Sequence, residues 1–442
     1  MKTMEDLKMY KPKLHITPIN NWMNDPNGLI YFNHEYHIFY QYFPYEPVWG
    51  TMHWGHKTSK DLVHFKDQGI ALYPSKAYDA NGCFSGSAIE VEQKLYLYYT
   101  GVKYTQTSEE DIHRSSGKII QCQAMLISED GYNFNNNAKQ MIIPPIEDAS
   151  IGDYYDARDP KVFKIKDTYF IVLGTKKDNK GRILIYESKD AINWNLKSIN
   201  EDERLGDMVE CPDLYNVDGK WIMTVSPMHT NHDGINYTSN CQYMLIDFDP
   251  DTGKITFESD PRLIDLGYDY YAAQTFKDEN NQTVILGWLR MPVPSHNWNG
   301  LYTFPRVIEY KNNHVYYHVH PSILKEFTSL SDTIDDQNAY WISVDVQEGS
   351  DLNIAGYLIK VQDGAILTDR SQVFAPPQRK PIGTQFKTPV IKGDIHLDIF
   401  LDQNVIEIYI NDGYYVLSNI IYHQSDELSF KEVKNLWIKK AQ

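Results

Sequence analysis

The sequence predicts an all-β protein: a five-bladed β-propeller followed by a β-sandwich. Three observations lead there. A short motif of a strand end, a Ser/Asp turn and an aromatic residue is repeated along the chain, alternating apolar strands lie between its copies, and long helical periodicity is missing. The copies are Thr58–Phe65, Ile127–Phe134, Glu187–Trp194 and, more loosely, Ile246–Phe257.

The copies recur at roughly 60 to 70 residues, and each suits the outer hairpin of a propeller blade. Lys94–Thr100 and Tyr169–Gly174 are examples of the alternating strands between them. Thr283–Trp288 supplies a strand of a further blade after the fourth copy. Four turns and this strand give five blades.

The pattern changes near residue 310, where about 130 residues of short strands begin. Gln403–Asn404 separates two of these strands as a hairpin would, and Asn411–Gly413 makes the next turn. We therefore expect a propeller over residues 1–310 and a β-sandwich over residues 311–442. The expected sandwich strands include Tyr340–Val346, Ile395–Asp402 and Val405–Ile410.

Composition narrows the functional class. The chain of 442 residues can bury a large core, and its formal net charge of −17 argues against nucleic acid or an anionic membrane as a partner. Met1–Lys8 lacks the features of a secretory signal, so we expect a cytoplasmic protein. Its oligomeric state is left open.

No metal or cofactor is expected. His53 and His56 lie three residues apart on a predicted strand, point to opposite faces and lack a third ligand. The four cysteines have no paired short spacing, so we expect reduced thiols. They are Cys83, Cys122, Cys211 and Cys241.

Three acids occur in similar local settings. Asp25 lies on a predicted rigid turn within Asn21–Gly28, and Asp159 and Glu210 each stand at the start of a strand-like segment. A proline follows each acid within two residues. Hydrolysis of a glycosidic bond needs a proton donor and a second carboxylate that faces the anomeric carbon, so these acids are catalytic candidates.

The order and spelling of these motifs, with Phe84–Ala88 between the first two and Tyr270–Phe276 after the third, resemble glycoside hydrolase family 32. This is the family of invertases, sucrose-6-phosphate hydrolases, levanases and inulinases. The resemblance runs from about Leu14 to Gly413. It implies a retaining β-fructofuranosidase on a five-bladed propeller.

The resemblance also implies roles for the three acids: Asp25 as the nucleophile, Glu210 as the acid/base, and Asp159 as the acid that holds fructosyl hydroxyls. The apolar neighbours of Glu210 favour a proton donor, whereas the amides beside Asp25 and the guanidinium of Arg158 beside Asp159 should keep both aspartates ionised. Taken alone, Arg158 and Asp159 would be read as an ordinary ion pair.

Eight further residues match the family's sugar-site motifs and are expected to bind substrate. They are Asn24, Gln41, Trp49, Trp54, Phe84, Ser85, Arg158 and Trp288. The chain departs from the family at Ser226–His229, where many bacterial sucrases read Ser-Pro-Gln-Gly. We expect this segment at the pocket rim, so the departure bears on the choice of substrate.

The leading hypothesis is hydrolysis of sucrose, sucrose 6-phosphate or short fructo-oligosaccharides. A fructosyltransferase on the same fold is an alternative, and a sugar-binding propeller without catalysis is another, disfavoured because all three acids are present. A phosphorylated substrate would need cations at the pocket rim. The candidates are Lys57, Lys103, Arg114 and Lys118.

Overall fold

The computed structural model describes residues 11–232, 235–295, 297–374, 383–422 and 424–442. Nearly all of its regular structure is β, and the predicted fold class, a five-bladed β-propeller followed by a β-sandwich, is confirmed. The chain forms two compact units. One comprises Pro18–Leu263 and Tyr271–Gly287, and the other comprises Met1–Thr17, Ile264–Tyr270 and Trp288–Gln442.

The first unit contains the sheets of four blades, each with its strands in antiparallel order. The first sheet holds β1 (Asn21–Phe32), β2 (Glu35–Phe43), β3 (His53–Ser59) and β4 (Phe65–Leu72). The second holds β5 (Gly82–Val91), β6 (Lys94–Tyr104), β7 (Ile119–Ser128) and β8 (Gln140–Ile143), and the third β9 (Ala157–Ile165), β10 (Thr168–Lys177), β11 (Lys180–Ser188) and β12 (Asn195–Glu201).

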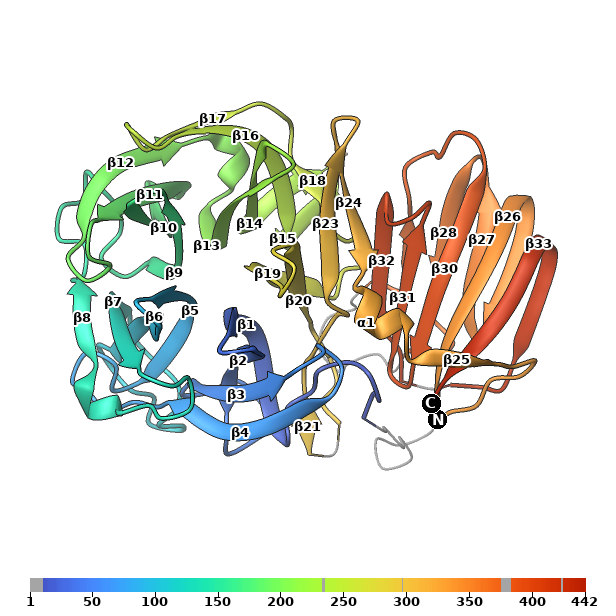
Figure 1. Ribbon diagram of the computed structural model, residues 1–442, viewed down its shortest axis with the longest axis horizontal. Coiled ribbons are helices and arrows are strands. Elements are labelled where there is room, and N and C mark those ends of the chain that lie inside the picture. Colours follow the sequence, from blue (N-terminus) through green and yellow to red (C-terminus); the bar gives the residue numbers. More distant parts are fainter. Residues whose placement is uncertain (1–10, 233–234, 296, 375–382, 423) are drawn as a thin grey trace. The chain divides into compact units, whose positions relative to one another are not determined.

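The fourth sheet holds β13 (Met208–Val217), β14 (Lys220–His232), β16 (Gln242–Asp249) and β17 (Lys254–Phe257), with β15 (Ile235–Ser239) beside β14 and β18 (Arg262–Leu263) beside β16. β19 (Tyr270–Lys277) and β20 (Thr283–Leu289) begin the fifth blade. The strands β1, β5, β9 and β13 are the first of their blades and lie around a common centre (Figure 1). Two short 3₁₀ turns, η2 (Asn136–Ala138) and η3 (Glu203–Leu205), complete the unit.

The repeated Ser/Asp motif is the turn between the third and fourth strand of a blade. In the first three blades one aspartate accepts hydrogen bonds from two backbone N–H groups of its own turn, which closes the turn locally. These aspartates are Asp61, Asp130 and Asp190. The looser fourth copy places Asp249 between β16 and β17, where it accepts from the N–H of Asp251.

The inner strands are irregular at corresponding places. The pairing register shifts between Met23 and Pro26 in β1, between Phe84 and Gly86 in β5, and between Glu210 and Asp213 in β13. The predicted turn within Asn21–Gly28 is therefore wrong: this segment belongs to β1 and is a bulged strand. A bulge bends a strand and re-aims the side chains beside it.

The third blade shows the same device at Asp159, whose φ of 66° lies in the left-handed region. The register of β9 against β10 shifts at this position, opposite Val172 and Gly174. Cys211 in β13 also has a positive φ, 46°. Non-glycine residues adopt such angles at a cost that the surrounding structure must offset, and they cluster at functional sites.

Apolar side chains between the sheets hold the blades together. One cluster joins the second and third blades and includes the fully buried Tyr98, Ile171 and Leu184. The Tyr98 hydroxyl also donates to the carbonyl of Ala191, 2.7 Å away. Truncating a core leucine such as Leu184 to alanine costs about 2 to 5 kcal/mol in comparable cores.

The second unit contains β21 (Trp298–Asn299), β22 (Leu301–Tyr302), β23 (Arg306–Lys311), β24 (His314–Val319), the one-turn helix α1 (Pro321–Leu324) and β25 (Phe327–Leu330). Its remaining strands form the predicted sandwich: β26 (Ala339–Ile354), β27 (Tyr357–Gln362), β28 (Ala365–Asp369), β29 (Gln385–Lys387), β30 (Ile395–Asp402), β31 (Val405–Ile410), β32 (Tyr415–Ile420) and β33 (Leu428–Ala441).

The long strand β26 connects the two layers of the sandwich. Residues 339–346 pair with β30, whereas residues 351–354 pair with β27. The predicted hairpin is confirmed, because Asp402 pairs with Val405 across Gln403–Asn404. Within the described residues, no helix has the length and apolar character needed to cross a membrane.

Candidate active site

Asp25 is held in the bulged part of β1 by two side-chain donors. Ser85 on β5 donates its hydroxyl to Oδ2 at 2.6 Å, and Asn24 donates its amide to Oδ1 at 3.0 Å. The indole N–H of Trp22 in turn donates to the Asn24 side-chain oxygen at 2.7 Å. Both carboxyl oxygens of Asp25 therefore have fixed partners, and the group is oriented before any substrate arrives.

Asp159 lies near Asp25 through a shared neighbour. The thiol of Cys211 is 3.6 Å from Asp159 Oδ2 and 3.7 Å from Asp25 Oδ2. The backbone N–H of Cys211 donates to Asp159 Oδ2 at 2.9 Å, and the backbone N–H of Asp159 donates to the Thr100 hydroxyl at 2.9 Å. Residues of β1 and β9 thus meet β13 around one buried thiol.

Glu210 directly precedes Cys211 and is bound by two side chains from other blades. Arg158 donates from Nε and Nη2 to Glu210 Oε1 at 3.1 and 3.0 Å. The hydroxyl of Tyr271, on β19, donates to Oε2. The expectation of an apolar setting for Glu210 is wrong, because its sequence neighbours are apolar but its spatial neighbours are polar.

Arg158 is itself positioned by a second carboxylate. Its Nη1 donates to Asp156 at 2.7 Å, and Asp156 also pairs with Lys176 at 2.6 Å. The guanidinium therefore bridges Asp156 and Glu210. Its side chain is directed at Glu210, where sequence reasoning paired it with its neighbour Asp159.

The electrostatics of the site correct a second expectation. Burial raises the pKa of Asp159 to about 7, although Arg158 acts in the opposite direction. Burial also raises the pKa of Asp25 above its ordinary value, opposed by the hydrogen bond from Ser85 and reinforced by the charge of Glu210. The prediction that Arg158 keeps Asp159 ionised is thus wrong near neutral pH, because desolvation outweighs the guanidinium. At Asp25 burial likewise acts against the hydrogen bonds that favour the ionised form.

The aromatic candidates divide into buried and accessible residues. Trp54 is fully buried and donates its indole N–H to the carbonyl of Phe84 at 3.0 Å, so it supports the backbone beside Ser85. Trp49 and Phe84 are partly exposed and meet edge to face, with ring centroids 5.9 Å apart. Gln41 is buried and donates to the carbonyl of Cys83 at 3.0 Å.

Trp288 is the one candidate outside the first unit. It lies in β20 and is partly buried. Nothing in the geometry of the first unit places it with the three acids, so its assignment to the site stays a prediction.

Sequence reasoning did not assign Tyr271, Asp156, Lys176 or Cys211 to the site. Tyr271 lies in the Tyr270–Phe276 motif, which was singled out for its resemblance alone, and Cys211 lies between Glu210 and Pro212. Asp156 and Lys176 gave no local signal, because their role depends on pairing across β9 and β10. All four cysteines are buried thiols that form no disulfide. In the described part of the chain, no three His, Cys, Asp or Glu side chains are arranged to hold a metal ion.

Comparison with known proteins agrees with this geometry. Residues 15–321 match the N-terminal domain of the glycosyl hydrolases family 32, and residues 335–439 match the C-terminal domain of the same family. The chain belongs to glycosyl hydrolase family 32.

Similar proteins extend over nearly the whole chain. A sucrose-6-phosphate hydrolase of Zymomonas mobilis is 32% identical over 94% of this chain and 88% of its own length, and one of Escherichia coli is 31% identical over 95% and 90%. Among solved structures, a sucrose-6-phosphate hydrolase from Lactobacillus gasseri is similar with a TM-score of 0.85 and 26% identity, covering 99% of this chain and 96% of that one. A GH32 β-fructofuranosidase of Bombyx mori is similar with a TM-score of 0.81 and 27% identity, covering 98% and 94%.

Proposed function

We propose that this protein is a retaining β-fructofuranosidase that releases fructose from sucrose, sucrose 6-phosphate or short fructo-oligosaccharides. One observation carries the proposal: Asp25, Asp159 and Glu210 come from three different blades and gather around Cys211 and Arg158. The family membership and the similar sucrose-6-phosphate hydrolases support the substrate class.

Asp25 is the proposed nucleophile because Ser85 and Asn24 fix its position and their hydrogen bonds favour its ionised form. Its oxygen forms a bond to the anomeric carbon of the fructosyl group as the bond to the bridging oxygen breaks. Ser85 and Asn24 hold the carboxylate during this step. The product is a covalent fructosyl-enzyme.

Glu210 is the proposed acid and base. In the first step its proton passes to the bridging oxygen and the glucosyl product leaves. In the second step Glu210 takes a proton from the water that attacks the fructosyl-enzyme. Arg158 and Tyr271 keep its two oxygens in place through both steps.

Asp159 is the proposed hydroxyl-binding acid. A carboxyl group whose pKa is about 7 exists in both protonation states near neutral pH, so it can donate a hydrogen bond to a fructosyl hydroxyl or accept one. Its backbone is fixed by Thr100 and its Oδ2 by the N–H of Cys211. The side chain is therefore a rigid anchor for the sugar ring.

The stereochemical course tests the mechanism. A retaining enzyme holds its two carboxyl groups roughly 5 Å apart, and we expect this separation for Asp25 and Glu210. Turnover of sucrose in aqueous methanol should yield methyl β-fructofuranoside, identified by NMR. The α anomer would refute the assignment, and chain-lengthened products at high sucrose would favour the fructosyltransferase.

Preference for a phosphorylated substrate depends on cations near the site. Lys57 is buried and paired with Asp67 at 3.0 Å, and Arg114 pairs with Asp111. Lys118 is exposed, and its ammonium lies 4.3 Å from the ring centre of Tyr155, three residues before Arg158. We therefore choose Lys118 as the candidate phosphate contact.

Kinetics on sucrose and sucrose 6-phosphate test this choice. Lys118→Ala should lower kcat/KM for sucrose 6-phosphate about twofold to fivefold, which corresponds to the free energy of one exposed ion pair. It should leave kcat/KM for sucrose unchanged. Lys94→Ala, which removes an exposed lysine of β6 paired with Glu129, is the matched control and should change neither constant. Equal specificity constants for both sugars in the unmodified protein would instead indicate a sucrose or fructo-oligosaccharide hydrolase. The cytoplasmic location also stays a prediction, which cell fractionation checks.

A further inference from the structure

The first unit contains a second pocket, away from the three acids. Its cavity volume is about 480 Å³, within the usual range for small-metabolite sites. It is lined by the later residues of the inner strands, such as Leu29–Tyr31 of β1 and Asp213–Asn216 of β13, whereas the acids stand near the starts of β1, β9 and β13. The pocket is thus lined by residues that follow the acids along these strands.

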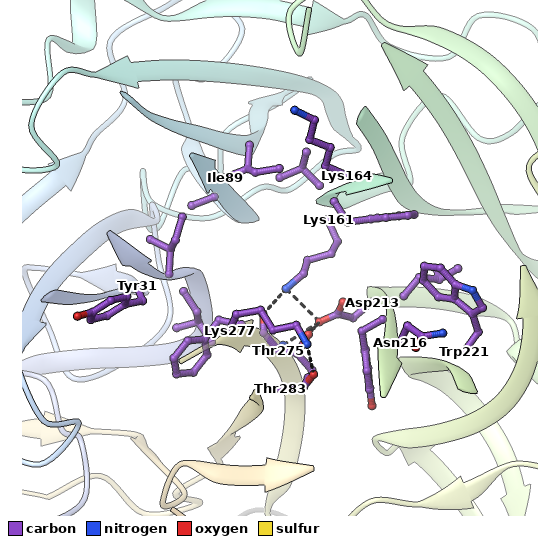
Figure 2. A pocket seen from close by; sticks show the side chains of 18 residues that line it. Tyr31, Ile89, Lys161, Lys164, Asp213, Asn216, Trp221, Thr275, Lys277 and Thr283 are labelled. Carbon is purple, nitrogen blue, oxygen red and sulfur yellow. Dashed lines mark hydrogen bonds and ion pairs between the residues drawn. The ribbon is translucent and has the colours of Figure 1, made fainter. Parts of the chain in front are cut away.

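The deepest polar group in this pocket is Asp213, which is fully buried. Its Oδ2 accepts from the backbone N–H of Thr275 at 2.7 Å and the Thr275 hydroxyl at 2.9 Å, and it pairs with the ammonium of Lys161 at 3.0 Å. Figure 2 shows Lys161 reaching from β9 toward both residues. Strands β9, β13 and β19 are joined in this way.

The other oxygen of Asp213, Oδ1, is buried and accepts no hydrogen bond from any described residue. A buried carboxylate oxygen without a donor is costly, and native structures rarely leave one unmatched. A hydroxyl group of a molecule bound in the pocket would match this oxygen.

Positive charge dominates the pocket. Its lining contains Lys161, Lys164 and Lys277 but only one acid, Asp213, so its formal charge is +2 on a chain whose net charge is −17. Lys277 is exposed and donates to the Thr283 hydroxyl at 2.7 Å. Desolvation lowers the pKa of Lys277, and the charges of Asp278 and Asp218, outside the lining, act in the opposite direction.

The positions of the lysines in the pocket differ. Figure 2 shows the ammonium of Lys164 turned away from Asp213, whereas Lys161 and Lys277 both face the Asp213 and Thr275 side. These two ammonium groups suit an anion. The partly buried rings of Tyr31 and Trp221 add flat apolar walls, which suit the C–H face of a sugar.

We propose that this pocket binds a small polyhydroxylated anion, the class that includes sugar phosphates and sugar acids. The acidic group pairs with Lys277 and Lys161, a hydroxyl donates to Asp213 Oδ1, and the carbon skeleton lies against Tyr31 and Trp221. The site is separate from the three acids, and the proposal does not depend on the proposed catalytic activity.

Calorimetric titration of the full chain tests the proposal. The probes are glucose 6-phosphate and gluconate, which distinguish a sugar phosphate from a sugar acid, with glucose and inorganic phosphate as the two halves of the ligand. All titrations contain saturating fructose, to occupy the other site. We expect one charged sugar to bind at least tenfold more tightly than either half.

Variants locate the binding. Lys277→Met should weaken binding of the charged sugar about tenfold or more. Lys189→Met, which removes the same charge from an exposed blade turn, should weaken that binding less than twofold. Binding should be unchanged in Asp25→Asn. Loss of binding in Asp25→Asn, equal binding of inorganic phosphate, an unaffected Lys277→Met variant or no binding of any probe would each overturn the proposal. Sucrose turnover, measured in parallel, reports separately on the proposed function.

Discussion

Two clusters of three carboxyl groups, one in each compact unit, can be compared in the described part of the chain, and they differ in the positive charge that accompanies them. In the first unit, the guanidinium of Arg158 donates to Glu210 and Asp156, whereas Asp159 and Asp25 accept from neutral donors. Burial raises the pKa of Asp25, and that of Asp159 to about 7. This cluster carries more acid than its cation can compensate.

In the second unit, Asp265, Asp402 and Glu407 surround the fully buried Arg306 and His15. Burial alone would raise the pKa of Glu407, but Arg306 and His15 outweigh it and hold that pKa at about 2. Burial likewise lowers the pKa of His15, yet hydrogen bonds to Asp402 and Glu407 raise it overall. Every carboxylate in this cluster has a cation.

This difference in charge balance distinguishes a cluster that stabilises the fold from a cluster that takes part in a reaction. Buried charge is tolerated when it is paired and hydrogen-bonded, and such a cluster fixes the local fold. A cluster with too few cations stores electrostatic strain, which is relieved when a proton moves or a substrate binds, and this is the usual condition of an active site. The two clusters should therefore respond in opposite ways to mutation.

The largest effect is expected on turnover. Asp25→Ala removes the nucleophile and should lower kcat for sucrose about 10⁴-fold or more, by analogy with other covalent catalysts. Glu210→Ala should lower kcat about 10²-fold to 10⁴-fold. Azide should partly restore the rate on substrates with good leaving groups. Steady-state kinetics measure both losses.

The matched control for these variants is Asp190→Asn, in a blade turn. It removes a carboxylate with local backbone partners and should keep kcat within twofold. An Asp25→Ala protein with a near-normal rate would end the mechanistic assignment. A folded Asp25→Ala protein, shown by unchanged circular dichroism, makes the comparison valid.

The second effect concerns the paired cluster. Arg306→Met leaves Asp265 and Glu407 buried without their guanidinium, and should cost about 3 to 5 kcal/mol of unfolding free energy. Chemical unfolding followed by circular dichroism measures the loss. Lys311→Met, which removes an exposed pair with Glu309, should cost less than about 1 kcal/mol.

If Arg306→Met does not fold, the double variant Arg306→Met, Glu407→Gln gives the answer. Removing one of the stranded charges should recover part of the lost stability. A single variant as stable as the unmodified protein would mean that this cluster is not needed to balance charge.

The sequence could predict features whose cause is local. The blade turns were visible because Asp61 and Asp190 bond to their own turn, and the Gln403–Asn404 hairpin because its strands are adjacent in sequence. The three acids were visible because each has a distinct motif. These parts of the fold and site follow from neighbouring residues.

The remainder depends on residues from different blades. The bonds from Arg158 and Tyr271 to Glu210 span 52 and 61 residues, and the bonds from Thr275 to Asp213 span 62. Burial of Asp159 is also a property of the folded chain, so its raised pKa could not be predicted from the adjacent arginine. Burial of Asp159 in the folded chain raises its pKa more than Arg158 lowers it.

The third effect is a pH dependence of stability. Between pH about 4 and 7 the folded chain retains a proton on Asp159 that the unfolded chain has lost, so this residue makes the protein less stable as pH rises through that range. Asp159→Asn should remove this slope. The difference in unfolding free energy between variant and unmodified protein should change by about 2 to 3 kcal/mol from pH 5 to 8.

Unfolding at several pH values measures this difference, and Asp190→Asn is again the control. Hydrogen bonds within its turn lower the pKa of Asp190, so its contribution to stability is lost only in acid. The difference in unfolding free energy between Asp190→Asn and the unmodified protein should therefore stay constant above pH 5. Glu407 has the same sign as Asp190: its stabilisation is lost as pH falls from about 4.5 toward 2. A flat profile for Asp159→Asn would mean that the site holds its charges without strain.

The smallest effect tests how the unbalanced cluster is held in position. Tyr271 donates one hydrogen bond to Glu210 Oε2, and Arg158 retains Oε1, so Tyr271→Phe should misplace the acid without removing it. One hydrogen bond to a charged group is worth roughly 1.5 kcal/mol, which corresponds to about a tenfold loss in kcat with KM little changed. Tyr215→Phe removes another buried hydroxyl in the same unit, bonded to Thr224 at 2.8 Å, and should leave kcat unchanged. Equal losses in the two variants would show that Tyr271 acts through general stability, whereas a loss in Tyr271→Phe alone shows that the position of Glu210 limits the rate.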